Sequence, residues 1–594
     1  MNLESYFFEK VAEAIKVLYG SVDEKMVQLQ KTRKEFKGDI TLVTFPLLKL
    51  SKKSPEQTAQ QLGEYLSTNV NEVAEFNVVK GFLNISLASS FWIEQLNEVA
   101  SVSEFGNASS SGKTTMVEYS SPNTNKPLHL GHIRNNLLGA SVSKLLKAAG
   151  NKVIQVNLVN DRGIHICKSM VAWKRFGMGE TPLTHGKKGD HLVGDYYVAF
   201  DKAYKAEVQD LIASGRSKED AEKLAPLMLE AQDMLRKWEA SDADTINLWK
   251  TMNGWVYEGF AKTYSDLGIS FDNTYYESQT YLQGKAIVQT GLEKGVFYKK
   301  EDGSVWVDLT ADGLDEKLLL RADGTSVYMT QDLGTAVQRF TEEKLDEHIY
   351  VVGNEQNYHF QVLKLVLQKL GYEWAQNIFH LSYGMVELPE GKMKSREGTV
   401  VDADDLVEEM VSTARDMSQE LGKLDGRTPE EAMQVARMVG LGALKYFILR
   451  VDPRKSMTFD PRESIDFNGN TGPFIQYTHA RIKSVLRKAE EQNINFAACK
   501  DLNLLVAEKE ISLIKLVNEF PSTVAAAAAD LSPAVVANYC YDISKEYNQF
   551  YHELSVLKEE NVDIRNMRLL LSAQVAKVIA SGMNLLGIEV PERM

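Results

Sequence analysis

A strand–helix–strand alternation in residues 114–161 restricts the fold more than any other feature of the chain. T-T-M-V-E-Y-S-S-P reads as a strand ending in a turn, and N-K-V-I-Q-V-N-L-V-N-D reads as the next strand. Between them, H-I-R-N-N-L-L-G-A-S-V-S-K-L-L-K-A-A-G reads as a helix closed by Gly150. This β–α–β order predicts a parallel, doubly wound sheet that binds its ligands at the carboxyl ends of its strands.

The remaining chain predicts further units, because 594 residues exceed the roughly 250–300 that one core supports. We expect a small α+β domain over residues 1–110 and an all-α bundle over 403–594. Between them, a Rossmann-type α/β domain over 111–402 would carry a helical insertion at about 170–265. Its later strands are expected at S-V-W-V-D-L, S-V-Y-M-T-Q-D-L, H-I-Y-V-V-G and I-F-H-L-S-Y-G-M-V.

The first hundred residues mix both periodicities. Residues 3–19 have helical apolar spacing, and Pro55–Leu66 follows a plausible Ser54 N-cap. Two segments read as strands, G-D-I-T-L-V-T-F-P-L-L-K-L and F-N-V-V-K-G-F-L-N-I-S-L, the second broken at Gly81. The Ser- and Gly-rich stretch 101–113 reads as a linker.

Composition narrows the class of protein. The N-terminus lacks the pattern of a secretory or transit signal, and no apolar run approaches the ~18 residues of a membrane span. The three cysteines form no C-x-x-C pair, so neither zinc nor a disulfide framework is expected. We therefore predict a cytoplasmic protein without membrane contact. A net charge of −14 disfavours a non-specific nucleic-acid binder but leaves room for a local basic surface.

The segment V-E-Y-S-S-P-N-T-N-K-P-L-H-L-G-H-I-R-N-N, residues 117–136, lies where the first strand passes into its helix. Free backbone N–H groups and the helix dipole make such a turn a phosphate site. His129 and His132 can donate hydrogen bonds to phosphoryl oxygens, and Gly131 lets a nucleotide approach the backbone. Two structural histidines are the alternative, which the strand–turn–helix context disfavours.

His129–His132 resembles the H-I-G-H signature of class I aminoacyl-tRNA synthetases, with Leu130 at the second position. The longer segment is similar to arginyl-tRNA synthetases. The similarity extends through V-N-D-R-G at Val159–Gly163 to the helical C-terminus. The resemblance implies arginine activation by ATP and transfer to the 2′-hydroxyl of the terminal adenosine of arginine tRNA. It also implies a monomer that activates arginine only with tRNA bound.

The resemblance further implies an arginine pocket, since a guanidinium needs carboxylates in a fork geometry. Asp332 and Glu277 would face the guanidinium, and Tyr328, one helical turn before Asp332, would pack beside the side chain. Asn123, Ser121 and Gln356 would hold the α-amino and carboxylate groups of arginine. Glu118 would support the pocket. Taken singly, Glu277 or Gln356 could be a solvated loop residue.

The loop G-K-M-K-S-R-E-G-T-V, residues 391–400, resembles the K-M-S-K-S loop of class I enzymes imperfectly. Lys392 and Met393 match, whereas Lys394 and Ser395 stand at the first Ser and second Lys positions. Lys126, three residues before His129, is a candidate substitute for the missing lysine. We expect electrostatic stabilisation of the phosphates and no general base, with Mg²⁺ accompanying ATP. The stabilising residues would be His129, His132, Lys126 and Lys392.

Two further regions resemble tRNA-contacting parts of the family. The C-terminal helices resemble its anticodon-binding domain, and on one helix Arg481, Lys483 and Arg487 would face solvent or phosphate. The N-terminal unit resembles the domain that touches the outer corner of tRNA. Phe82 and Asn84 are candidates there for stacking and base contact, with structural strand residues as the alternative.

Three other identities remain open from the sequence. A class I synthetase for another amino acid would ordinarily show zinc ligands or an editing domain. If the chain were a small nucleotidyltransferase, its C-terminal helices would have no explained role. A catalytically inactive tRNA-binding paralogue is disfavoured by His129, His132 and Asp332, although the altered loop keeps it open.

Overall fold

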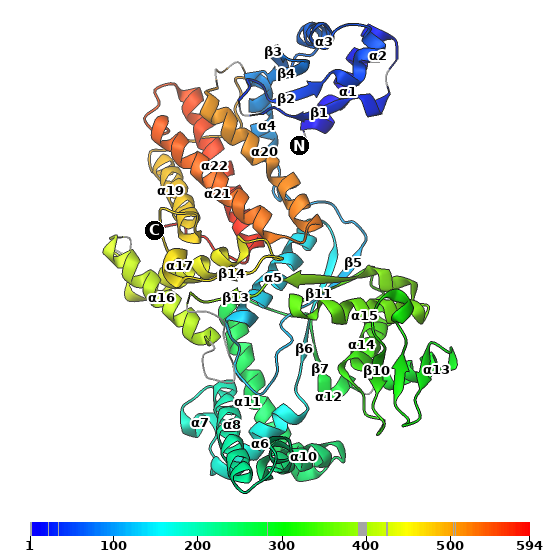
Figure 1. Ribbon diagram of the computed structural model, residues 1–594. Coiled ribbons are helices and arrows are strands. Elements are labelled where there is room, and N and C mark those ends of the chain that lie inside the picture. The colour runs from blue at the N-terminus through cyan, green and yellow to red at the C-terminus, as the bar shows by residue number, and fades with distance from the viewer. Residues whose placement is uncertain are drawn as a thin grey trace.

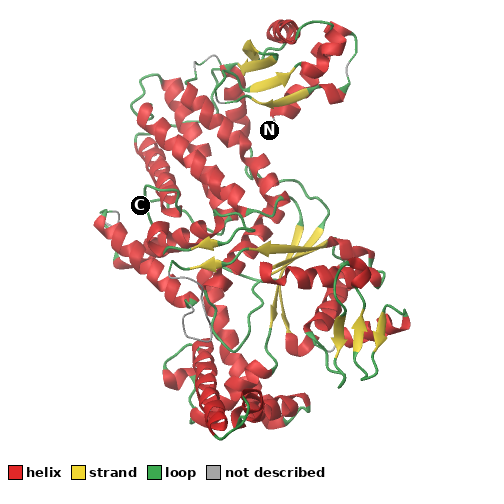
Figure 2. Ribbon diagram, viewed as in Figure 1, coloured by secondary structure: helices red, strands yellow, loops and turns green. Residues whose placement is uncertain are grey.

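The computed structural model describes residues 3–21, 23–33, 35–281, 283–389, 401–422, 426–502, 504 and 506–594. The N-terminal unit lies beside the C-terminal bundle, the central sheet follows below the bundle, and the insertion lies at the opposite end of the molecule from the N-terminal unit (Figure 1). Strands are confined to the N-terminal unit, the central sheet, a small sheet beside it and a short pair near the bundle (Figure 2). The predicted α/β architecture with an α+β N-terminal unit and a helical C-terminal unit is confirmed.

The central sheet has five parallel strands in the order β12-β11-β5-β6-β7. Helix α5 connects β5 to β6 and packs its apolar face against both the sheet and the C-terminal bundle. The strand order reverses between β5 and β11, which is where open α/β sheets bind ligands. The strands are β5 (Thr114–Glu118), β6 (Lys152–Val159), β7 (Asn273–Tyr276), β11 (Glu347–Gly353) and β12 (Ile378–Tyr383), and α5 is Leu130–Ala148.

A predominantly helical insertion connects β6 to β7, as predicted. Its own core includes Cys167, Phe200 and Leu227, so it packs as a unit and does not merely extend from the sheet. Its helices are α6 (Ile164–Phe176), α7 (Pro182–His185), α8 (Gly189–Ala213), α9 (Lys218–Leu224), α10 (Pro226–Glu239) and α11 (Ala243–Leu267).

Two of the strands predicted for the central sheet are not part of it. S-V-W-V-D-L forms β9, which belongs to a separate antiparallel sheet of order β10-β9-β8. S-V-Y-M-T-Q-D-L begins helix α14, because Met329, Leu333, Ala336 and Phe340 recur at helical spacing and are all buried. The elements are α12 (Glu277–Thr280), α13 (Gln283–Glu293), β8 (Phe297–Lys299), β9 (Val305–Val307), β10 (Lys317–Leu320), α14 (Tyr328–Glu343) and α15 (Asn357–Lys369).

The N-terminal unit is a four-stranded antiparallel sheet of order β1-β2-β4-β3 with helices against it. Ser54 caps α3 in a capping box, and the turn at Gly81 separates β3 from β4, both as predicted. F-P-L-L-K-L is helical and not a strand, since Phe45–Leu47 forms a turn of 3₁₀ helix with Pro46 in its first turn, and α2 follows directly. The elements are α1 (Leu3–Tyr19), β1 (Gln28–Lys31), β2 (Ile40–Val43), α2 (Leu48–Ser51), α3 (Pro55–Asn69), β3 (Val73–Val79), β4 (Phe82–Leu87) and α4 (Ser89–Ser101).

The C-terminal unit is a bundle of long helices that continues the core of the central domain. It is not entirely helical, because β14 (Met457–Thr458) pairs in parallel with β13 (Val386–Glu387). The helices are α16 (Ala403–Glu420), α17 (Pro429–Leu449), α18 (Pro461–Ser464), α19 (Gly472–Glu491), α20 (Glu508–Ala529), α21 (Pro533–Glu553) and α22 (Val562–Leu585).

Helix α17 is the only described helix long and apolar enough to cross a membrane, judged by length and composition alone. However, 67% of its most apolar window is buried inside the protein. Its apolar side chains, among them Leu444, Phe447 and Ile448, belong to the main core. Because its apolar side chains are buried in the main core, the high hydropathy of α17 is that of a core helix.

Candidate active site

The turn between β5 and α5 holds both signature histidines at the start of the helix. His129 is the N-cap of α5, and its Nδ1 accepts a hydrogen bond from the backbone N–H of Gly131 at 3.1 Å. Nδ1 of His132 accepts from the backbone N–H of His129 at 3.2 Å, and the two ring centroids are 4.0 Å apart. The two imidazoles are thus fixed by the backbone of the turn that the sequence predicts as a phosphate site.

Both imidazoles are neutral near pH 7. Burial, with the charge of Lys126, lowers the pKa of His129 to about 3, and burial lowers that of His132 well below its ordinary value. Because each Nδ1 already accepts an N–H, the single ring proton must be on Nε2. Each ring can therefore donate from Nε2 to a phosphoryl oxygen without carrying a charge.

A cavity of about 430 Å³ lies between this turn and helix α8 of the insertion. Lys126 lines it, and burial lowers the pKa of its ammonium. The other charged or polar lining residues include Asn123, His129, His165, His191, Asp195 and Asp402. The cavity thus brings the predicted Lys126, His129 and Asn123 together.

The two carboxylates predicted for the guanidinium lie on neighbouring helices, α12 and α14. Glu277 is the first residue of α12, and burial, with a smaller contribution from the charge of Asp332, raises its pKa to about 7. Asp332 is on α14, one turn after Tyr328, and its Oδ2 lies 2.6 Å from Nε2 of His359. Tyr328 is 74% exposed. The charge of Asp332 is a minor cause of the raised pKa of Glu277, so each carboxylate lies within the electrostatic influence of the other.

The residues predicted for the amino-acid head group lie at the ends of neighbouring strands. Ser121 has left-handed backbone geometry (φ 45°), and its N–H donates to Oδ1 of Asn157 at 3.0 Å. Asn123 pairs through its backbone with Asn160, beyond the end of β6. Gln356 is exposed in the turn after β11. All three are therefore at the carboxyl edge of the sheet.

Glu118 differs from the other predicted pocket residues because it is buried and already paired. Its carboxylate contacts the guanidinium of Arg339 of α14, and both residues are almost fully buried. Nε2 of His348 lies 3.7 Å from the same oxygen. The structure therefore gives Glu118 a direct contact with the helix that carries Asp332, behind the pocket.

Asp161 is a residue that the sequence did not single out. Its carboxylate accepts hydrogen bonds from the backbone N–H and Oγ of Ser278 at 2.8 and 2.7 Å, and from Tyr257 at 2.8 Å. Ser278 follows Glu277, so Asp161 fixes the turn that carries Glu277. The sequence signals were the position of Asp161 two residues beyond β6 and its place in the V-N-D-R-G segment.

The predicted loop residues Lys392, Met393, Lys394 and Ser395 lie outside the described residues. The chain on either side of this segment is attached to the phosphate turn and to α5. Ahead of it, β13 pairs with β14, and Arg134 of α5 donates to the carbonyl oxygen of Lys455 at 2.7 Å. After it, the N–H of Leu130 donates to the carbonyl oxygen of Val401 at 3.1 Å.

The predicted tRNA-contacting residues of the bundle divide into two groups. Arg481 and Arg487 line a groove of about 380 Å³ together with Tyr477, Lys488 and other residues. Arg481 also lies over the ring of Tyr477, 4.8 Å from its centroid. Lys483, in contrast, is outside this lining and forms an ion pair with Glu592 at 3.0 Å.

The two predicted contact residues of the N-terminal unit are on β4. Phe82 is half-buried, with its ring 5.7 Å from that of Phe45. Asn84 is 2% exposed, and its amide is hydrogen-bonded to Thr41 and Asn77 at 2.7 and 2.9 Å. Asn84 is thus hydrogen-bonded within the sheet in this structure, and its role as a base contact stays a prediction.

Three protein-family models match the chain. "Arginyl tRNA synthetase N terminal domain" matches residues 6–87, "tRNA synthetases class I (R), catalytic domain" matches 95–460, and "DALR anticodon binding domain" matches 475–594. The second match ends beyond the expected domain boundary at 402.

Curated relatives and solved structures agree with these matches. The arginine–tRNA ligases of Bacteroides thetaiotaomicron and Bacteroides fragilis are 64% and 63% identical to this chain, each over the full length of both proteins. Thermus thermophilus arginyl-tRNA synthetase superposes with a TM-score of 0.78 at 25% identity, covering all of both chains. The Plasmodium falciparum enzyme has the same fold, with a TM-score of 0.73 at 18% identity over 100% and 99% of the two chains. With a catalytic-domain match over more than half of its length and full-length relatives at such identity, the chain belongs to the arginyl-tRNA synthetase family, within class I of the aminoacyl-tRNA synthetases.

Proposed function

We propose that the chain is an arginine–tRNA ligase whose ATP phosphates bind at the His129–His132 turn and whose arginine side chain binds between Glu277 and Asp332. The observation that carries this proposal is the pairing of an uncharged donor turn with two neighbouring carboxylates at one edge of the sheet. Such a site suits an anionic nucleotide and a cationic amino acid at once.

In the first step, a carboxylate oxygen of arginine attacks the α-phosphorus of ATP. The new O–P bond forms as the bond to the bridging oxygen breaks, and pyrophosphate leaves with its electron pair. The Nε2–H groups of His129 and His132 stabilise the charge that develops on the phosphoryl oxygens. In the second step, the 2′-hydroxyl of the terminal adenosine attacks the arginyl carbonyl carbon. AMP leaves, and the hydroxyl proton passes to solvent or phosphate.

Two lysines would share the stabilisation of pyrophosphate in this proposal. Lys126 lines the cavity beside His129, and Lys392 belongs to the predicted signature loop. If Lys126 contributes, Lys126→Ala lowers the rate of arginine activation, and activation at the wild-type rate would remove it from the site.

Magnesium would enter as the counter-ion of ATP. Mg²⁺ favours carboxylate and phosphate oxygens. Of the carboxylates nearest the turn, Asp402 accepts the backbone N–H of Asp404 at 2.8 Å, and Asp404 contacts Lys188 at 2.6 Å. The described residues around the turn therefore favour coordination of the ion through the phosphates of ATP.

Other parts of the proposal concern the context of the enzyme. The chain would act as a monomer in the cytoplasm without zinc, and it would need tRNA for arginine activation. The domain boundaries at residues 110 and 402 are part of the same proposal. The groove lined by Arg481 and Arg487 would bind the phosphates of the anticodon arm.

The test is a charging assay with the purified full chain, ATP and unfractionated tRNA, using each amino acid in turn. Arginine alone should become attached to tRNA, and periodate treatment of the tRNA should abolish attachment. Charging with a different amino acid would contradict the proposed pocket, and tRNA binding without charging would make the chain an inactive paralogue.

A further inference from the structure

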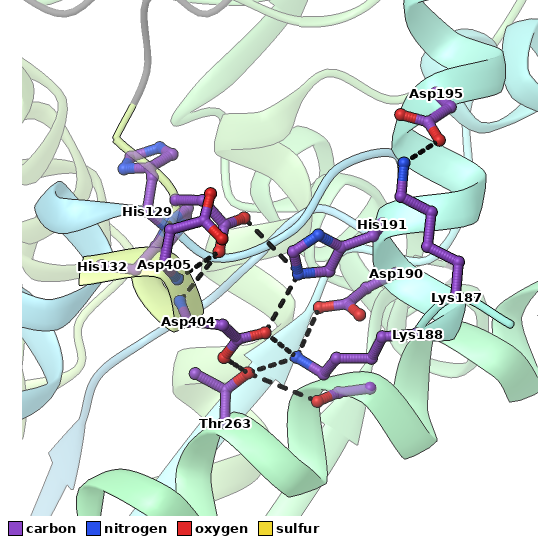
Figure 3. Close-up of polar contacts among 12 residues, drawn as sticks. His129, His132, Lys187, Lys188, Asp190, His191, Asp195, Thr263, Asp404 and Asp405 are labelled. Carbon is purple, nitrogen blue, oxygen red and sulfur yellow. Dashed lines mark hydrogen bonds and ion pairs between the residues drawn. The ribbon is translucent and has the colours of Figure 1, made fainter. Parts of the chain in front are cut away.

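The carboxylate of Asp404, at the start of α16, is held by three side chains of the helical insertion (Figure 3). Oδ2 accepts from Nζ of Lys188 at 2.6 Å and from Nε2 of His191 at 3.0 Å. Oδ1 accepts from Oγ1 of Thr263 at 2.8 Å. Lys188 and His191 belong to the start of α8 and Thr263 to α11, so two helices of the insertion meet one carboxylate. We call these four residues the Asp404 clamp.

The clamp is partly buried, so solvent screens the interactions among its charges less than it screens a surface ion pair. The side chains of Lys188, His191 and Asp404 are 17%, 20% and 29% exposed. Burial opposes ionisation of Asp404, yet the hydrogen bonds from His191 and Lys188 leave its pKa well below the ordinary range. The hydrogen bond to Asp404 is the main cause of a raised pKa at His191.

Asp190, His191 and Asp404 are residue types that can bind a metal ion, but the ammonium of Lys188 already supplies a cation to the two carboxylates. The ammonium of Lys188 lies 3.1 Å from Oδ2 of Asp190 and 2.6 Å from Oδ2 of Asp404. A divalent ion between these carboxylates would have to displace Lys188. The cluster is therefore better understood as a structural contact between the insertion and α16.

The residues just before Asp404 are bonded to the phosphate turn. The N–H of Ala403 donates to the carbonyl oxygen of Leu128 at 3.0 Å, and the N–H of Leu130 donates to that of Val401 at 3.1 Å. Between these bonds, Asp402 pairs through its backbone with His129. Residues 401–403 thus form a short antiparallel contact on both sides of His129.

We propose that Lys188, His191 and Thr263 are positioning residues for arginine activation: by holding Asp404 they fix residues 401–403 against the turn and so orient His129 and His132. The inference rests on the proposed function, because it assigns these histidines to the phosphates. The first chemical step would then require that the insertion keep its contacts with Asp404. None of the three residues needs to touch ATP or arginine.

The first test compares Asp404→Asn and Thr263→Val in ATP–pyrophosphate exchange with arginine and tRNA present. Asn removes the charge that Lys188 and His191 hold, so we expect kcat to fall roughly 10- to 100-fold, as misplacement of catalytic groups does. Thr263→Val removes one hydrogen bond and should cost about threefold. The KM for arginine should stay unchanged, because Glu277 and Asp332 lie on other elements.

The matched control is Asp201→Asn, the same substitution on α8, where Asp201 forms an ion pair with Lys205 at 2.7 Å on a more exposed part of the helix. It should leave kcat and KM at wild-type values. Thermal unfolding of every variant normalises the rates to folded protein. A kcat of folded Asp404→Asn equal to wild type would overturn the proposal.

The second test is the pH profile, which a merely structural contact would not alter. His191 faces Asp190 on its own helix and Asp402 and Asp404 at the start of α16, and Lys188 shares Asp404 with it. Lys126, His129, His165 and Asp195 line the same cavity. Because the pKa of His191 is raised, its charged contact is complete below its ordinary pKa and is lost as pH rises through the raised value.

In wild type, kcat should therefore fall by about two- to fivefold as pH rises through the raised pKa of His191, since Lys188 still holds Asp404. His191→Gln keeps a hydrogen-bond donor but cannot titrate, so its profile should lack this limb. A limb that persists in His191→Gln would overturn the role of His191. Absence of arginine-dependent exchange in wild type would instead refute the proposed function, so the two failures are distinguishable.

Discussion

Asp332 of α14 and His359 of α15 lie 2.6 Å apart, between Oδ2 and Nε2. The contact joins the helices that precede and follow β11 of the central sheet, and it fixes the direction of the carboxylate predicted to bind the guanidinium. An oriented carboxylate can accept a guanidinium in fork geometry, which a freely rotating one does less well.

Substitution of His359 should therefore weaken arginine binding without removing a direct contact. His359→Ala should raise the KM for arginine about 3- to 10-fold, the effect of one net hydrogen bond. His359→Gln, which can still donate to Asp332, should recover most of the loss. The KM for ATP is the internal control, and an equal rise in both constants would place the effect outside the pocket.

The raised pKa of Glu277 predicts a pH-dependent affinity for arginine. Burial raises this pKa to about 7, so in the free site Glu277 loses its negative charge as pH falls through 7. A protonated carboxyl attracts the guanidinium less, and the KM for arginine should rise by up to about tenfold per pH unit below 7. The KM for arginine, measured from about pH 5.5 to about pH 8.5, would show this dependence. Glu277→Gln should have a high KM with no such slope, and a parallel slope would assign the titration to another group.

The histidine turn can be tested without disturbing the helix cap. His129→Asn keeps a favoured N-cap residue for α5 but lacks a donor at the position of Nε2. Arginine activation should fall roughly 100-fold, as for loss of one transition-state donor, with little change in Tm. His129→Gln extends its amide toward the Nε2 position and should be the more active variant. Equal activity of the two variants would contradict a donor role for Nε2.

Arg481 and Lys483 offer a matched pair on α19. Arg481 lines the groove of the bundle, whereas Lys483 is paired with Glu592. Arg481→Gln should weaken tRNA binding and reduce the salt slope of log Kd by about one, the signature of a lost phosphate contact. Lys483→Gln should have a smaller effect, measured by filter binding at several salt concentrations. The reverse order would move the tRNA contact out of the groove.

The parts of the fold predicted from the sequence are those with a strong local signal. The β5–α5–β6 unit has buried strands, a Gly at the helix end and one uninterrupted helical period. S-V-Y-M-T-Q-D-L was misassigned because a short run such as Val327–Met329 is compatible with a strand as well as with a helix. The helical spacing from Met329 to Phe340 becomes clear only over a longer window.

Parts of the site could be predicted only where the functional residues are close together in the sequence. His129 and His132 share one turn, so their spacing together with the strand–turn–helix context singles them out. The Asp404 clamp could not be found this way, because Lys188, Thr263 and Asp404 are separated by whole helices and meet only in the folded chain. The assignment of Glu118 to the support of the pocket stays a prediction, and its burial against Arg339 depends on the packing of α14, which the sequence alone does not show.

The central claim is that this site activates arginine, and arginine-dependent ATP–pyrophosphate exchange measures that step directly. The assay uses the full chain with and without arginine tRNA, and compares arginine with every other amino acid. Our account predicts exchange with arginine alone, and only when tRNA is present. No exchange with any amino acid, by protein that still binds tRNA, would contradict the catalytic assignments of His129, His132, Glu277 and Asp332.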